Sequence, residues 1–317
     1  MEEHWIYEDG EKRRLKPFHG ILLFLAVMVS FYTIIAWAQM KWGMYGLALT
    51  ELYLLALSVL AAKFTGSSLR EIFPVKRPQW KKIFAVFLMW GSSYALLIPI
   101  TMMMAWLFPK QMFSVSGDLN SFITSVPPLV SVFISCVMPA VCEEAMHRGF
   151  ILKSFQTKWK NPWILCGAMG ILFGLFHGSI WRFLPTALLG GVLTYLMVKT
   201  ENMIYPALFH FINNFMPGLL AGSSGTSAQT EQVTAVLMQN GFPLVFLGIY
   251  IAMACVVPFG FYTGAYLLRK GEEGKIQKYL TSDKALVFLV VLTVLPILLG
   301  MFVFFYGIFF ENFSILS

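Results

Sequence analysis

The stretch 285–310 reads ALVFLVVLTVLPILLGMFVFFYGIFF and contains no charged residue. A helix that crosses the core of a lipid bilayer needs about 20 mostly apolar residues, so this stretch is long enough to span a membrane with some tilt. Apolar runs of similar character recur along the whole chain. The sequence therefore predicts an all-α protein, a polytopic transmembrane helical bundle.

The composition agrees with a membrane protein. Of the 317 residues, 58% are hydrophobic and 12% are charged, whereas a soluble domain carries about 25% charged residues. This excludes a soluble globule, a disordered chain and a small disulfide-rich secreted protein. All four cysteines lie in apolar segments without a CxxC pair, and we expect small buried side chains at Cys136, Cys142, Cys166 and Cys255.

Nine apolar runs are candidate spans, although the fifth and sixth are short and a count of eight stays possible. The runs are roughly 18–38, 44–64, 82–108, 121–142 and beyond, 162–178, 183–198, 203–221, 243–268 and 285–310. We expect the first run to be a retained helix, because it is longer than the apolar part of a signal peptide.

The basic residues predict the orientation of these spans. With the N-terminus inside, 20 of the 23 Lys and Arg residues fall in inside segments, and three fall outside: Lys41, Lys110 and Arg182. Such a bias is typical of cytoplasmic loops, so we expect an integral membrane protein, in the plasma membrane, with a cytoplasmic N-terminus. The net charge of +7 thus reflects topology, and we expect a lipid bilayer and no nucleic acid as partner.

Ionisable residues inside apolar runs are costly and usually functional. Three strings carry them: CEEAMHRGF at 142–150, FGLFH at 173–177 and HFINN at 210–214. Side chains four apart share a helix face, so Glu144 can meet Arg148, and His210 and Asn214 can face one cavity.

A depth estimate brings the strings together. At about 1.5 Å per residue, Glu143 and His177 each lie roughly 22 Å from the loop at 158–162 that joins their helices. The two side chains reach similar depth, and His210 enters from the same side. We therefore expect one central cavity within the membrane.

The three strings, EExxxR, FxxxH and HxxxN in this order, resemble the signature of the CAAX-protease and bacteriocin-processing (CPBP, or Abi) intramembrane peptidases. The resemblance covers about residues 120–220. It divides the chain into a tail with three spans at 1–120, a motif-bearing core at 121–221 and an outer loop with two spans at 222–317.

The resemblance implies an intramembrane endopeptidase that cuts a membrane-associated or lipophilic peptide, such as a prenylated one. Glu143 and His177 would activate water, and His210 and Asn214 would stabilise the oxyanion. Glu144 and Arg148 would form a supporting ion pair. The alternative is a non-proteolytic immunity or scaffold protein, in which the same charges only hold helices together.

The metal question stays open from the sequence. Glu143, His177 and His210 are residue types that bind zinc, but a metal-free glutamate mechanism uses the same side chains. The absence of a second ligand at close HxxxH spacing slightly favours the metal-free form, so no cofactor is assigned.

The other polar residues in apolar segments have simpler structural interpretations. We expect Asn213 and His147 to be structural, and Glu51 to lie near the outer interface without a partner. The pair Gly190-Gly191 predicts close helix packing.

Overall fold

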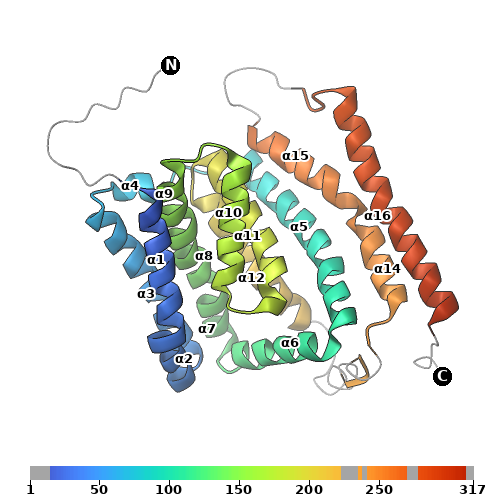
Figure 1. Ribbon diagram of the computed structural model, residues 1–317, viewed down its shortest axis with the longest axis horizontal. Coiled ribbons are helices and arrows are strands. Elements are labelled where there is room, and N and C mark those ends of the chain that lie inside the picture. Colours follow the sequence, from blue (N-terminus) through green and yellow to red (C-terminus); the bar gives the residue numbers. More distant parts are fainter. Residues whose placement is uncertain (1–14, 223–234, 238–240, 270–277, 312–317) are drawn as a thin grey trace.

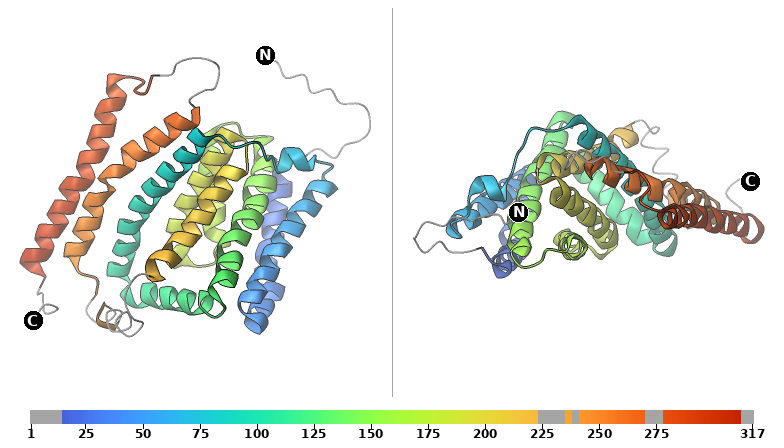
Figure 2. Two further views of the ribbon diagram at one scale, coloured as in Figure 1. Left: turned by 180° about the vertical axis from the view of Figure 1, so that it is seen from behind. Right: turned by 90° about the horizontal axis from the view of Figure 1, so that it is seen from above.

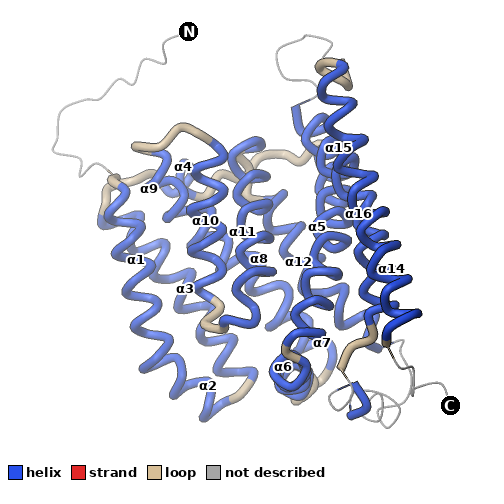
Figure 3. Tube along the Cα trace, turned by 45° about the vertical axis from the view of Figure 1, so that its right-hand side comes forward, coloured by secondary structure: helices blue, strands red, loops and turns tan. Residues whose placement is uncertain are grey.

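The computed structural model describes residues 15–222, 235–237, 241–269 and 278–311. These residues form helices and connections, without a strand among them (Figure 3). The prediction of an all-α bundle is confirmed. Seven helices in the described part of the chain are long and apolar enough to cross a membrane, by length and composition.

The first group of helices packs at one side of the bundle, at the left of Figure 1. It comprises α1 (Pro17–Ser30), a π-helical turn η1 (Phe31–Ile35), α2 (Ala36–Trp42), α3 (Met44–Phe64) and the short α4 (Leu69–Ile72). The first three of these form one continuous span, Pro17–Trp42. Gly43, with φ of 52°, then reverses the chain into α3, a conformation that glycine adopts at little cost.

The motif-bearing helices occupy the middle. They follow α5 (Trp80–Leu107) and α6 (Pro109–Ile123) and comprise α7 (Pro128–Val132), η2 (Phe133–Val137), α8 (Met138–Glu144), η3 (Ala145–Ile151), α9 (Leu152–Gln156), α10 (Pro162–Phe176), α11 (Ile180–Thr200) and α12 (Ile204–Gly222). The five elements from α7 to α9 make one span, Pro128–Gln156.

The C-terminal helices extend to the opposite side of the bundle (Figures 1 and 2). Helix α14 (Leu244–Met253), the 3-10 turn η4 (Ala254–Val256) and α15 (Val257–Arg269) form one span, and α16 (Asp283–Phe310) packs beside it. Only 11% of the most apolar window of α16 is buried, so most of its apolar side chains face outward, as side chains that contact lipid do.

Three predicted spans differ from the structure. Residues 121–123 belong to α6, and Pro127 and Pro128 separate this helix from the fourth span, because proline starts a helix but does not continue one. The fifth run forms the short α10, which is below spanning length. The run at 203–221 forms α12, which is not among the seven apolar spanning helices.

Two large apolar clusters hold the middle of the bundle together beside a smaller third one, and α10 joins the two large clusters. One cluster surrounds Val27, Leu54 and Met146, and Phe176 belongs to it. The other includes Val86, Leu193 and Phe209, and it contains Phe173. The C-terminal end of α10, where the second motif lies, is therefore fixed from both sides.

Candidate active site

The first motif lies on a helix with an altered turn. Residues Ala145–Ile151 form the π-helical turn η3 directly after Glu144, and such turns are frequent at functional sites. Gly149 follows the motif because its helix meets the α4 connection there: a Cβ would lie 2.6 Å from the ring of Phe73. The local sequence thus keeps the charged end of the motif inside the bundle.

Glu144 is the centre of a buried network. Its Oε1 accepts hydrogen bonds from Arg148 Nη1 at 2.8 Å and from His210 Nδ1 at 2.8 Å. Arg148 Nη2 donates to the Gly190 carbonyl at 3.0 Å. Glu144 and Arg148 are both fully buried, so the network joins the first and third motifs away from water.

Glu143 lies next to this network. Its Oε2 is 3.9 Å from His210 Nε2, which is too long for a direct hydrogen bond. This buried oxygen has no hydrogen-bond partner. His210 therefore has Glu144 at one ring nitrogen and Glu143 near the other.

His177 is oriented by its own helix. Its Nδ1 lies 2.8 Å from the Phe173 carbonyl, and because a carbonyl only accepts, Nδ1 carries the hydrogen. The other nitrogen, Nε2, is left as an acceptor. Helix α10 has 15 residues and is about 22 Å long, shorter than the bilayer core of about 30 Å, so His177 stays at membrane depth if α10 begins at one surface.

The Phe173 ring brings the motifs into contact. It lies 4.8 Å from the His177 ring, 5.8 Å from the His210 ring and 5.1 Å from the His147 ring, all edge-on. The Arg148 guanidinium stacks over it at 4.4 Å, a cation–π contact. Phe173 explains why the second motif has an aromatic residue four positions before its histidine.

Asn214 is not hydrogen-bonded to His210, the residue with which the resemblance pairs it. Its amide donates to the Ser135 carbonyl at 3.1 Å, which ties α12 to η2. Within the described residues, no hydrogen bond joins Asn214 to His210, or Glu143 to His177. Asn213 contacts Asn214 at 3.4 Å.

Two ionisable residues lie closer to the site than their positions in the sequence indicate. Glu51 is 2% exposed, its carboxylate repels the like charge of Glu143, and its buried Oε2 has no hydrogen-bond partner. Arg182 interacts electrostatically with Glu143 and His177. It lies in the first turn of α11, which begins three residues before the predicted run at 183–198. One sequence feature could have indicated that Glu51 belongs near the site: it is an acid about seven residues inside an apolar run.

His147 is fully buried among aromatic rings. Its ring contacts Phe24, Phe173 and Phe176 edge-on, and neither ring nitrogen has a hydrogen-bond partner. It packs against the ring that holds both motif histidines. All four cysteines have free thiols; Cys136, Cys142 and Cys166 are buried as expected, whereas Cys255 is only half-buried.

The side chains as placed do not fit a metal ion. Both motif histidines use Nδ1 for an orienting hydrogen bond, as metal ligands often do. Yet no three His, Cys, Asp or Glu side chains in the described ranges lie together in a way that could hold a metal.

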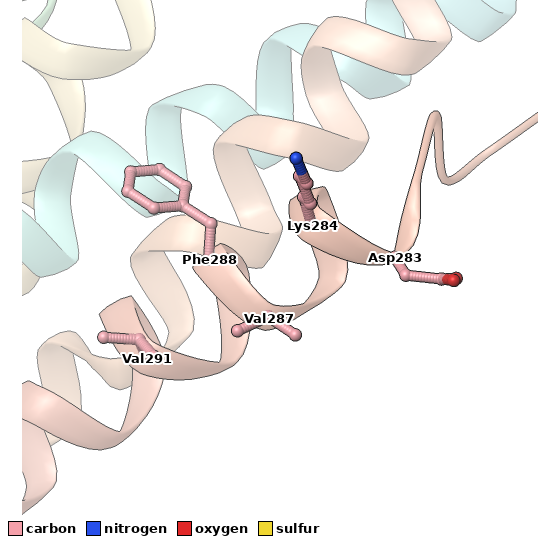
Figure 4. A pocket seen from close by; sticks show the side chains of 5 residues that line it. All are labelled: Asp283, Lys284, Val287, Phe288 and Val291. Carbon is pink, nitrogen blue, oxygen red and sulfur yellow. The ribbon is translucent and has the colours of Figure 1, made fainter.

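A separate depression on the outside of α16 contains none of these residues. Figure 4 shows its lining. The five lining residues are Asp283, Lys284, Val287, Phe288 and Val291. It follows one face of a single helix, far along the chain from the motifs, and we assign it no chemistry.

Comparison with known proteins matches the region of these motifs. Residues 125–216 match the family model described as "Type II CAAX prenyl endopeptidase Rce1-like". The protein YyaK of Bacillus subtilis (strain 168), named as uncharacterized, is 26% identical over 151 residues, which is 45% of this chain. The chain spans about half (48%) of the length of that relative. No solved structure matches.

Proposed function

We infer the function from one premise: residues 125–216 of this chain belong to the family of type II CAAX prenyl endopeptidases, within the CPBP intramembrane peptidases. We propose that the protein is an intramembrane endopeptidase that hydrolyses a membrane-associated or lipophilic peptide, with a prenylated peptide as the first candidate. The observation that carries this proposal is the buried cluster of Glu143, Glu144, His210 and Arg148, reinforced by His177 across the Phe173 ring.

In the proposed reaction, Glu143 is the general base. Its Oε2 has no hydrogen-bond partner in the protein and can accept a proton from water, which then attacks the peptide carbonyl. His177 Nε2 is an acceptor and helps to position this water. The proton on Glu143 passes to the leaving amine as the bond breaks.

His210 stabilises the oxyanion as a donor from Nε2. It can donate there only when both ring nitrogens carry hydrogen, because Nδ1 already donates to Glu144. The buried Glu144 carboxylate stabilises that imidazolium, as the aspartate of a Ser-His-Asp triad does for its histidine. Asn214 would supply a second donor after its amide turns from the Ser135 carbonyl.

We extend the proposal to the whole chain. The N-terminus is cytoplasmic, the membrane is the plasma membrane, and the spans of 1–120 and 222–317 pack around the core at 121–221. These flanking spans would limit how a lipophilic peptide reaches Glu143.

Glu143→Gln tests the proposal, because the amide keeps the shape of the side chain but cannot act as the base. Cells would express wild type or this variant at matched membrane levels, and new peptide termini would be mapped by mass spectrometry. We expect termini that appear with wild type and disappear with the variant. Glu201→Gln, at an exposed carboxylate, is the matched control and should behave as wild type.

Identical termini with wild type and a folded Glu143→Gln protein would contradict a peptidase. That result would favour the alternative function of an immunity or scaffold protein.

A further inference from the structure

Arg182 lies on the same tight turn as His177. Helix α10 ends at Phe176, His177 caps it, and Gly178 reverses the chain with φ of 61°. Ser179 precedes α11, and the Arg182 backbone N–H bonds its carbonyl at 3.2 Å. A Cβ on Gly174 would lie 2.8 Å from the Phe183 ring, so the first turn of α11 packs against the last turn of α10.

The position of Arg182 is unfavourable for a merely structural cation. The first turn of a helix carries the positive end of the helix dipole, which disfavours Lys and Arg. Arg182 is half-buried in a membrane bundle, where an ionisable side chain is costly. A residue kept at such a cost points to a role in the site.

The guanidinium of Arg182 is also free to bind a ligand. In the part of the chain that the structure describes, no hydrogen bond or ion pair engages its side chain, whereas Arg148 is held by Glu144 and the Gly190 carbonyl. The groups that interact with it electrostatically are Glu143 and His177. Arg182 thus presents five N–H donors in the first helical turn after His177, within electrostatic reach of the proposed base.

A planar guanidinium binds a carboxylate through two parallel hydrogen bonds. A peptide brings a carboxylate at its C-terminus or on an Asp or Glu side chain. We propose that Arg182 binds a carboxylate of the peptide substrate and thereby places the scissile bond over Glu143. This inference rests on the proposed endopeptidase function and adds a requirement for an acidic group near the cleaved bond.

The test uses the full-length protein in lipid nanodiscs and three versions of one S-farnesylated peptide that ends in Cys-Val-Ile-Met. The first has a free C-terminal acid, the second a C-terminal amide, and the third an amide with Glu in place of the last Met. The variants are Arg182→Gln and Arg182→Lys, with Lys110→Gln as the control at an exposed cation of α6.

We expect wild type to cleave the acid at least about tenfold better than the plain amide, mainly through a lower KM. Arg182→Gln should remove this preference, so that it cleaves the acid and the amide at similar rates, and Arg182→Lys should keep part of it. Lys110→Gln should match wild type. Cleavage of the Glu-containing amide like the acid would assign side-chain carboxylates to Arg182 as well.

Equal cleavage of acid and amide by wild type would overturn the inference. So would an equal loss on both peptides in Arg182→Gln, because this would mean that Arg182 only supports Glu143 or the fold.

Binding separates this inference from the proposed function. Each peptide would be titrated into the Glu143→Gln protein with and without Arg182→Gln, and binding followed by thermal shift. An acid preference that depends on Arg182, without cleavage by wild type, would contradict the peptidase and keep the carboxylate site. No acid preference in binding would overturn the carboxylate site.

Discussion

Glu144 carries two hydrogen bonds on one oxygen, and its other oxygen, Oε2, is buried without a partner. Removing one member of a buried ion pair leaves the other charge uncompensated, which costs about 3–5 kcal/mol. The pair of Glu144 and Arg148 is therefore a requirement of the folded state as well as a support of His210.

Glu144→Gln should lower the unfolding temperature in detergent by several degrees, because Arg148 then remains buried beside a neutral amide. Glu201→Gln is the control: its pair with Lys76 is 3.4 Å long, both side chains are more than half exposed, and such pairs contribute about 0–1 kcal/mol. Equal unfolding temperatures for wild type and Glu144→Gln would show that the buried pair adds no stability.

The spacing of residues along the sequence predicted some of these contacts and not others. The i, i+4 rule predicted the contact of Glu144 with Arg148, which the structure shows at 2.8 Å. The contact of Glu144 with His210 joins residues 66 positions apart, and the sequence did not predict it: the three motifs indicated only that both side chains face one cavity. Arg182 was assigned to a loop because a charge near the end of an apolar run looks like its boundary.

At the scale of elements, the packing of α10 on α11 fixes the site. A Cβ on Gly190 would lie 2.7 Å from the Phe173 Cβ and 3.1 Å from the Gly170 Cα. The Gly190 carbonyl also accepts hydrogen bonds from Arg148 and Thr194. Small residues at helix contacts let backbones approach closely in membranes. Here that approach sets the position of the Phe173 ring.

Gly190→Ala should reduce the activity at least about tenfold, because a new methyl group must push Phe173 away from both motif histidines. Gly191→Ala is the matched control, since its Cβ would meet only the Cys166 carbonyl at 3.5 Å, an ordinary contact. The measurement is the rate of peptide cleavage together with the unfolding temperature. Full activity of Gly190→Ala would show that catalysis does not depend on the present position of the Phe173 ring.

The elements themselves were partly predictable. Apolar length predicted the spans around α3, α5 and α16 to within a few residues. Hydropathy does not reveal the π-helical turns in η2 and η3, because they change the hydrogen-bond pattern and not the composition. It also merged the end of α6 with the fourth span. The pair Gly190-Gly191 predicted close packing, which the structure shows at Gly190 alone.

At the scale of the whole molecule, the helix ends separate by charge. The connections at 65–79, 157–161 and 201–203 lie at one end of the bundle, the upper end in Figure 1, and α6 lies across the other end. The first of these segments carries Arg70, Lys76 and Arg77. These basic segments thus share one end of the bundle, as the alternation of basic loops predicted.

Cysteine labelling in intact cells decides that orientation. Lys158→Cys lies exposed between α9 and α10, and Ser116→Cys lies exposed on α6 at the other end. The background would carry Cys255→Ala, because the other three cysteines are buried and react slowly. With the N-terminus inside, a maleimide that cannot cross membranes should label Ser116→Cys in intact cells. It should label Lys158→Cys only after the membrane is opened. The reverse pattern would invert the topology and would place the connection between α9 and α10 on the outer side of the membrane.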